Sequence, residues 1–244
     1  MIEPSHRLSI TIMTSATFIG RISLIAFVVF LFNGSLHLVQ LGFSERAALV
    51  WDGLLSVVFF LQHSGMVRRG LRARMANVIP QYYHGALFSI LSGIVLTILM
   101  VAWQSSTTLL YDLRGFPRWL MRFFTFLSIA GLGWGVYTMR SFDPFGRIAI
   151  RCHLKGRQVR PPQFVVRGPY LWVRHPLYSS MLLLIWSCPE LSTDRLLFNI
   201  LWTTWIYVGT LLEEADLVAD FGETYRDYRR RVPMLIPWRI PRVS

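Results

Sequence analysis

"ISLIAFVVFLFNGSLHLVQL", residues 22–41, runs for twenty positions without a formally charged side chain. An α-helix rises ~1.5 Å per residue, so a stretch of this length can cross a ~30 Å hydrocarbon layer. Residues 86–103 form a second uncharged block, 47–67 contain one acidic residue, and 119–139 contain one arginine. These blocks predict a multi-pass membrane protein with four helical spans before residue 140.

Two further apolar segments follow, Leu177–Pro189 and Leu196–Leu212. The first is only thirteen residues, or ~20 Å as a helix, which is too short to span alone. Either its helix runs through Pro189 with a kink, or this hairpin does not fully cross. The predicted fold class is all-α, a multi-pass transmembrane helical bundle of five to six spans with a C-terminal cytoplasmic helix.

The chain divides by chemistry into two parts of one integral membrane domain. Residues 1–139 hold the four N-terminal spans. Residues 140–244 hold a long basic loop, the short hairpin and a C-terminal amphipathic helix, with Pro233 expected to end that helix. No internal repeat and no low-complexity stretch interrupts this order.

The formal net charge of +12 is concentrated in two connections. Four arginines lie in residues 68–74, after the second span, and eight basic residues lie in residues 140–174, after the fourth. The positive-inside rule places both connections, and with them both termini, in the cytoplasm. Basic loops beside spans are explained by topology and anionic headgroups, so we expect membrane lipids as partners and no nucleic acid. No metal-binding motif is present, since Cys152-His153 alone lacks the ligands of a zinc site.

A dense group of polar and aromatic residues, "RGPYLWVRHPLYSS" at 167–180, precedes the fifth apolar segment. After the hairpin, Glu214 opens a stripe that continues through Val218, Phe221, Tyr225 and Tyr228. Steps of four and three residues trace one face of a helix, so we expect Glu214 on the buried face. Glu213 then points about 100° round the axis. A buried carboxylate at the membrane boundary is costly without a cationic partner or a ligand.

Together these two pieces resemble the signature of the isoprenylcysteine carboxyl methyltransferase superfamily, integral membrane enzymes that use S-adenosylmethionine; phospholipid N-methyltransferases share the C-terminal pattern. The matching residues are Gly168-Pro169-Tyr170, Arg174-His175-Pro176-x-Tyr178, Glu213-Glu214 and Phe221-Gly222-x-x-Tyr225-x-x-Tyr228. More narrowly, "LQHSGMVRRG" at 61–70, "SFDPFGR" at 141–147 and "YRDYRRRVPMLIPW" at 225–238 resemble the bacterial methanethiol S-methyltransferases. This chain departs from the pattern at Ser179-Ser180, because the family usually has glycine two positions after Tyr178.

The resemblance implies that the C-terminal loop and helix bind S-adenosylmethionine. The expected cofactor-binding residues are Gly168, Pro169, Tyr170, His175, Pro176, Tyr178, Glu213, Tyr225, Tyr228 and Arg229. A sulfonium cation suits tyrosine faces and a carboxylate, and the cofactor's own carboxylate suits Arg174 or Arg229. There is no glycine-rich nucleotide-binding loop of the Rossmann type.

Glu214, His63 and Arg174 are the expected catalytic residues. His63 lies near the cytoplasmic end of the second span, where it could take a proton from a thiol. Structural roles are open for the same groups: His63 in hydrogen bonds between spans, Arg174 as a headgroup anchor, and Tyr225 and Tyr228 as interfacial aromatics.

The function expected from the sequence is methylation of a small thiol, such as methanethiol, to a thioether such as dimethyl sulfide. The methyl acceptor would be a small or lipid-like molecule, and the protein would lie in a bacterial inner membrane. Two alternatives are open. The same fold could methylate a prenylcysteine carboxylate or a lipid amine, or it could be a catalytically silent membrane scaffold.

Overall fold

The computed structural model describes residues 4–139, 143–159 and 163–239. Five of the described helices are long and apolar enough to cross a membrane. The described strands are two short ones that pair with each other. The predicted all-α multi-pass bundle is therefore confirmed.

The chain forms two compact units, residues 1–106 with 143–161 and residues 107–142 with 162–244. Helix α5 (Phe116–Thr138) thus groups with the C-terminal helices, and α6 (Arg147–Leu154) groups with the N-terminal ones. The division into 1–139 and 140–244, which was drawn from sequence chemistry, stays a prediction.

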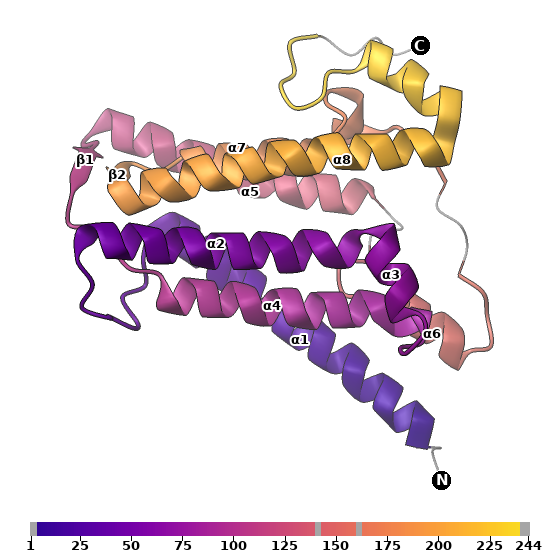
Figure 1. Ribbon diagram of the computed structural model, residues 1–244. Helices are drawn as coiled ribbons and strands as arrows, with labels where there is room; N and C mark the ends of the chain where they lie inside the picture. The colour runs from indigo at the N-terminus through magenta and orange to yellow at the C-terminus, as the bar shows by residue number, and fades with distance from the viewer. Residues whose placement is uncertain (1–3, 140–142, 160–162, 240–244) are drawn as a thin grey trace. The chain divides into compact units, whose positions relative to one another are not determined.

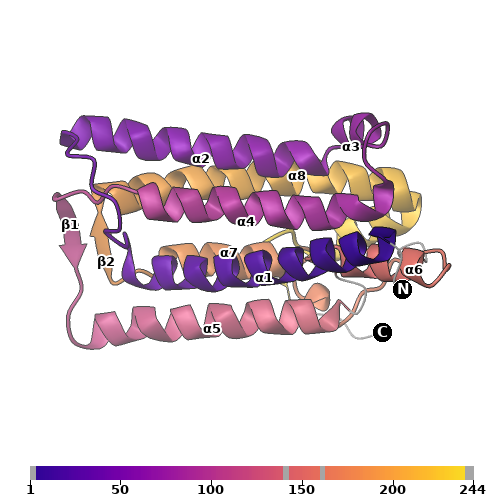
Figure 2. The same ribbon diagram turned by 90° about the horizontal axis from the view of Figure 1, so that it is seen from below.

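In the first unit, α1 (Pro4–Asn33), α2 (Glu45–Val67) and α4 (His84–Ala102) run side by side, with the short α3 (Arg69–Met75) turned aside after α2 (Figure 2). Glycines let α1 and α4 approach closely. A Cβ on Gly93 would lie 2.8 Å from Ile19 Cγ2, and one on Gly20 would lie 2.6 Å from Ser89 Oγ. Small residues at a helix interface are a common means of packing spans in lipid.

The first span ends earlier than hydropathy predicts. Helix α1 stops at Asn33, and the apolar span runs from His6 to Asn33 rather than over residues 22–41. The backbone leaves the helical region at Gly34 (φ 86°) and at His37 (φ 51°). The predicted C-terminal boundary was therefore wrong, because a hydropathy pattern does not detect a change of backbone conformation.

Part of the basic loop packs onto the first unit through α6. Ile150 is fully buried in a cluster with Ala16 of α1, Ala86 of α4 and Tyr83 of the short helix η1 (Gln81–Tyr83). Gly146 (φ 64°) precedes α6, and a Cβ there would lie 2.2 Å from the Ala86 nitrogen. Only glycine allows this close backbone contact.

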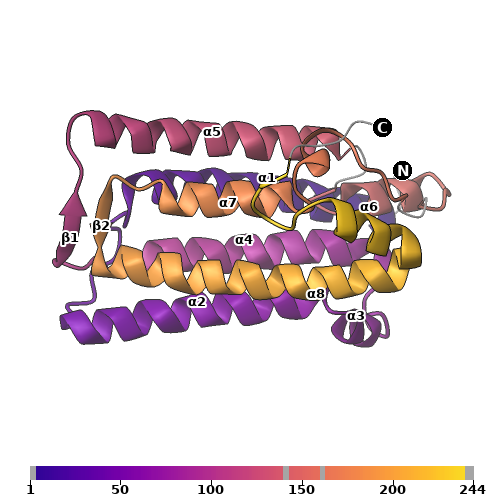
Figure 3. The same cartoon turned by 90° about the horizontal axis from the view of Figure 1, so that it is seen from above.

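The second unit contains β1 (Leu109–Asp112), α5, η2 (Gly168–Leu171), α7 (Pro176–Trp186), β2 (Glu190–Ser192) and α8 (Thr193–Arg231). Figure 3 shows α5, α7 and α8 side by side, with the two strands at one end. The strands are antiparallel, with Asp112 opposite Glu190. Helix α7 packs on α5 over two glycines, since a Cβ on Gly131 or Gly135 would lie 2.6 Å from a side-chain atom of α7.

The structure resolves the alternatives for the hairpin. Helix α7 has eleven residues, ~16 Å, and ends at Trp186, so it does not continue through Pro189. The chain then runs on to β2, whose partner β1 precedes α5. From Thr193 to Glu214, α8 rises ~32 Å, about the thickness of a hydrocarbon layer. The paired strands and Glu214 are therefore separated along α8 by about the thickness of a hydrocarbon layer.

Polar side chains satisfy the carbonyl groups where α7 ends. Thr125 Oγ1 of α5 donates a hydrogen bond to the Ser187 oxygen at 3.1 Å. Arg195 Nη2 of α8, from a residue that is 5% exposed, donates to the Ile185 oxygen at 3.3 Å. Within a membrane such carbonyls require protein partners, because water is excluded.

Helix α8 changes direction at Gly222, whose φ of 56° and ψ of −131° are not helical (Figure 1). The residues after it fold back, so the Tyr225 hydroxyl lies 3.3 Å from Glu214 Oε1. On a straight helix, eleven residues would separate these groups by ~16 Å. The prediction that one helix face carries Glu214 and both tyrosines was therefore wrong. The two sides of a turn bring them together.

Candidate functional site

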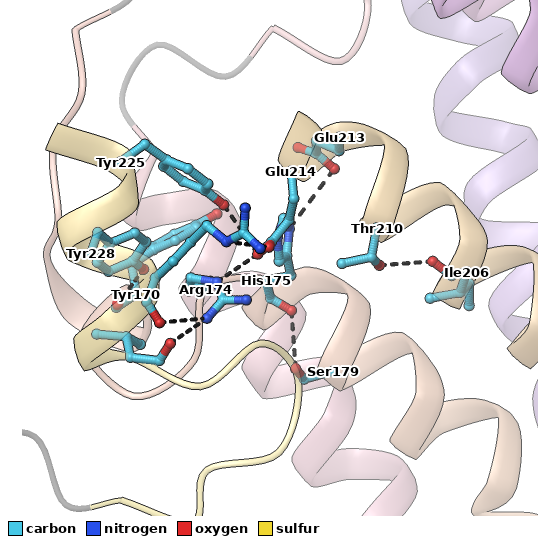
Figure 4. A network of polar contacts seen from close by, with 12 residues as sticks. Tyr170, Arg174, His175, Ser179, Ile206, Thr210, Glu213, Glu214, Tyr225 and Tyr228 are labelled. Carbon is cyan, nitrogen blue, oxygen red and sulfur yellow. Dashed lines mark hydrogen bonds and ion pairs between the residues drawn. The ribbon is translucent and has the colours of Figure 1, made fainter. Parts of the chain in front are cut away.

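The carboxylate of Glu214 is the centre of a buried polar network (Figure 4). Its Oε1 accepts hydrogen bonds from Arg174 Nε at 2.5 Å, from His175 Nε2 at 3.1 Å and from the Tyr225 hydroxyl at 3.3 Å. Its Oε2 lies 3.2 Å from Arg229 Nε. Glu214 is 4% exposed, so these partners supply the compensation that a buried charge requires.

Arg174 joins this carboxylate to the end of α8. Its Nη1 donates to the carbonyl oxygens of Val232 at 2.5 Å and Arg229 at 3.2 Å. Its backbone N–H donates to the Pro233 oxygen at 2.8 Å. The side chain is 9% exposed. A guanidinium group with this many protein acceptors is held in one position, which favours a positioning role over contact with a ligand.

His175 stands directly before α7 and links the two acids. Its Nε2 carries the hydrogen donated to Glu214, since a carboxylate only accepts. Its Nδ1 lies 3.9 Å from Oε2 of Glu213, and its ring stacks on Tyr178 with centroids 5.7 Å apart. The Glu213 side chain is 44% exposed. The prediction that Glu214 is buried while Glu213 points elsewhere is confirmed.

Tyr170 is the next aromatic residue of the site. Burial raises the pKa of its hydroxyl to about 12, and the negative charge of Glu213 contributes to the rise. The hydroxyl therefore stays protonated at neutral pH and can donate a hydrogen bond. Its backbone oxygen accepts a hydrogen bond of 2.6 Å from the Tyr228 hydroxyl, which fastens η2 to the folded-back end of α8.

An aromatic cluster backs the folded end of α8. The ring of Phe164 lies 5.4 Å from Phe221, 5.8 Å from Tyr225 and 5.4 Å from Tyr228, measured between centroids. Phe164 was not among the predicted site residues. The available signal was an aromatic residue followed by two valines just before the Gly-Pro-Tyr motif, in a basic loop.

The Gly-Pro-Tyr turn is fixed to the end of α5. Gly168 has a φ of 57°, and a Cβ there would lie 2.9 Å from Thr138 Oγ1. Arg167 donates two hydrogen bonds to the Thr138 carbonyl oxygen, at 2.9 Å from Nε and 2.6 Å from Nη2. Arg167 and Thr138 were not predicted, because no spacing in the sequence links positions 29 residues apart.

Twelve of the thirteen predicted site residues lie in the second unit. The buried prolines Pro169 and Pro176 each stand in the first turn of a helix. The exception is His63, on α2 of the first unit, where its ring lies 5.2 Å from Phe59 and 4.8 Å from Phe88. Its role as a base stays a prediction.

The exposed side of the network has the chemistry of a cation site. The half-exposed Glu213 carboxylate lies 3.9 Å from His175 Nδ1, while the buried Glu214 is already balanced by arginines. Among the described residues, no group of three or more His, Cys, Asp or Glu side chains could hold a metal ion. Among its described residues, the site therefore offers one half-exposed carboxylate that no arginine balances, next to the stacked rings of His175 and Tyr178.

Comparison with known proteins identifies the family. The family described as "NnrU protein" matches residues 53–201. Methanethiol S-methyltransferase 1 of Bradyrhizobium diazoefficiens is 30% identical over 80% of this chain and 69% of its own length. Methanethiol S-methyltransferase 2 of the same organism is 33% identical over 78% of this chain and 73% of its own length. Methanethiol S-methyltransferase of a Pseudomonas species is 32% identical, over 81% of this chain and 76% of its own. No solved structure matches. The chain is thus a multi-pass membrane protein of the NnrU family, and it belongs with the bacterial methanethiol S-methyltransferases in their membrane methyltransferase group.

Proposed function

We propose that this protein is an S-adenosylmethionine-dependent methyltransferase that converts a small thiol, such as methanethiol, to its methyl thioether. The similarity to relatives named methanethiol S-methyltransferase supports the reaction class. The observation that carries the cofactor assignment is the pair of neighbouring acids, of which Glu214 is buried and balanced and Glu213 is half-exposed beside His175.

When bound, S-adenosylmethionine supplies an electrophilic methyl group on a sulfonium. Glu213 and the rings of Tyr170 and Tyr178 present the negative charge and π-faces that favour such a cation. Arg229 is 46% exposed, and its Nε faces Glu214. Its other guanidinium donors are the best placed to bind the cofactor's carboxylate. Gly168, Pro169 and Pro176 shape the backbone around these groups.

Glu214 and Arg174 act as positioning residues in this proposal. They touch His175 and the end of α8 and so hold the exposed groups in place. Tyr225 and Tyr228 are positioning residues as well. Tyr225 donates a hydrogen bond to Glu214, and Tyr228 donates one to the backbone oxygen of Tyr170. Preorganised polar groups lower a barrier because they need no reorganisation during the reaction.

The methyl acceptor has to lose its thiol proton as the new carbon–sulfur bond forms. The expectation from the sequence that His63 takes this proton stays a prediction. A thiolate and a sulfonium neutralise each other during transfer, so an apolar site that excludes water favours the reaction. A small hydrophobic thiol suits such a site better than a charged substrate does.

The proposed location is the bacterial inner membrane, with both termini in the cytoplasm. The basic connections after α2 and α5 support this orientation by the positive-inside rule. The network around Glu214 then faces the cytoplasm, where the cofactor is made.

A methyl-transfer assay tests the proposal. Purified membranes receive methyl-labelled S-adenosylmethionine with methanethiol, a prenylcysteine or phosphatidylethanolamine. We expect volatile labelled thioether from the thiol only, and a loss of roughly tenfold or more for Glu213→Gln, the cost typical of removing one electrostatic contact. Glu223→Gln is the matched control, since that acid is exposed and pairs with Arg226.

Three results would count against the proposal. Preferential labelling of the prenylcysteine or the lipid would reject the thiol acceptor. No labelling of any acceptor, with an intact protein, would favour the silent scaffold. Equal activity of the Glu213→Gln and Glu223→Gln variants would reject the cation site.

A further inference from the structure

The segment after α8, residues 232–239, crosses the start of α7, and we call it the C-terminal strap. Three consecutive carbonyl oxygens of the strap accept hydrogen bonds from the start of α7. The bonds are Arg174 N to Pro233 O at 2.8 Å, His175 N to Met234 O at 3.2 Å, and Ser179 Oγ to Leu235 O at 2.7 Å. The strap backbone is therefore part of the structure that holds the site residues.

The second half of the strap turns its side chains away from the protein. Ile236 is 69% exposed and Trp238 is 65% exposed. Arg231 and Arg239 are exposed on either side of them, and Arg239 Nη1 donates to the Arg230 oxygen at 3.2 Å. Two large apolar side chains between two arginines form an amphipathic surface. No described residue of the second unit covers it.

The position of the strap fits the surface of a bilayer. The strap lies at the start of α7, beside the network of Glu214, which is ~32 Å along α8 from the paired strands. It therefore lies where a spanning helix leaves the hydrocarbon layer. Tryptophan is enriched at that boundary, and arginines just outside it attract anionic headgroups.

We propose that the strap docks on anionic phospholipid headgroups. Ile236 and Trp238 insert at the boundary between headgroups and acyl chains, and Arg231 and Arg239 contact lipid phosphates. Docking keeps the strap carbonyls against Arg174 and His175, so anionic lipid stabilises the arrangement around Glu214. Its effect on cofactor affinity rests on the proposed function, whereas docking itself does not.

Hydrogen exchange tests docking without any cofactor. The full-length protein is placed in nanodiscs of phosphatidylcholine, with or without phosphatidylglycerol. The amides of Arg174 and His175 report on the strap, because they donate to its carbonyls. We expect phosphatidylglycerol to slow their exchange by up to roughly thirtyfold, the ratio expected for two arginines near an anionic surface.

Two variants and one control make the test specific. Arg231→Gln with Arg239→Gln removes the lipid dependence but leaves the three hydrogen bonds to the strap carbonyls in place. Ile236→Ser with Trp238→Ser speeds exchange in both kinds of nanodisc. Arg114→Gln keeps the dependence, since Arg114 is 88% exposed beside β1, at the opposite boundary.

The outcomes separate the possible sources of protection. Slower exchange when inorganic phosphate is added to neutral nanodiscs would overturn lipid docking in favour of a free anion. Equal exchange in both nanodiscs, or an unchanged lipid dependence in the double arginine variant, would also overturn it. Lipid protection without binding of S-adenosylhomocysteine would instead reject the proposed function and support docking.

Discussion

Replacement of Gly222 by alanine tests whether the reversal of α8 builds the site. Gly222 has a φ of 56° and a ψ of −131°, a combination that an alanine adopts only under strain. A Cβ at this position would meet nothing within 4 Å. The cost therefore comes from the backbone alone, at about 1–3 kcal/mol.

Two of the contacts that hold the folded end in place are individually of similar strength. The hydrogen bond from Tyr225 to Glu214 contributes about 1 kcal/mol. The ion pair of the half-exposed Arg229 with Glu214 contributes at most about 1 kcal/mol. Because 1.4 kcal/mol is a factor of ten, the substitution lowers the ratio of folded-back to released tail by about 5- to 150-fold. Cofactor affinity falls by up to that factor, depending on how far the folded-back form predominates.

Titration calorimetry with S-adenosylhomocysteine on purified protein measures the effect. Gly209→Ala is the matched control, because Gly209 lies in the same helix and a Cβ there also meets nothing within 4 Å. In regular helix, alanine stabilises by about 0.5–1 kcal/mol, so this variant should keep its affinity. Gly222→Ala with both the affinity and the free energy of unfolding of the wild type would refute the reasoning. An equal loss in Gly209→Ala would attribute the effect to the helix in general.

Two further predictions concern the second unit. Tyr228→Phe removes the hydrogen bond to the backbone of η2 and should lower the free energy of unfolding by about 1 kcal/mol. Tyr137→Phe, at an 85% exposed position, is the control and should leave the free energy of unfolding unchanged. Gly135→Ala places a Cβ 2.6 Å from Leu177 Cδ2 and should lower the thermal midpoint by the equivalent of about 1 kcal/mol, because a side-chain end can partly move away. Gly133→Ala, on an open part of the same helix, should leave the midpoint unchanged, and equal midpoints for both glycine variants would contradict the predicted packing.

Hydropathy was a sound guide to the number and kind of helices, because burial in lipid requires long apolar segments whatever their neighbours. It failed at the ends. The apolar residues after Asn33 are not helical, since Gly34 and His37 have positive φ values. It also left the short hairpin undecided, since the end of α7 at Trp186 depends on partners from other helices.

For the site, the motifs located most of the residues but not their contacts. Periodicity correctly separated the buried Glu214 from the half-exposed Glu213. It wrongly assumed a straight helix through Gly222, because residue spacing does not reveal a reversal. The bonds from Arg174 to backbone carbonyls were also hidden, since every residue type carries a carbonyl group and no sequence pattern marks those near a distant side chain.

The short helix α7 is an exception to the usual rule that more apolar side chains suit a membrane segment better. Where α7 stops, the carbonyls of Ile185 and Ser187 depend on Arg195 and Thr125. Leucine at either position would make the sequence look more lipid-compatible. At position 125 it would leave the Ser187 oxygen without this donor, and at position 195 it would leave the Ile185 oxygen with only the Asn199 amide as a nearby donor. Engineering of this protein for higher yield should therefore leave these two polar side chains in place.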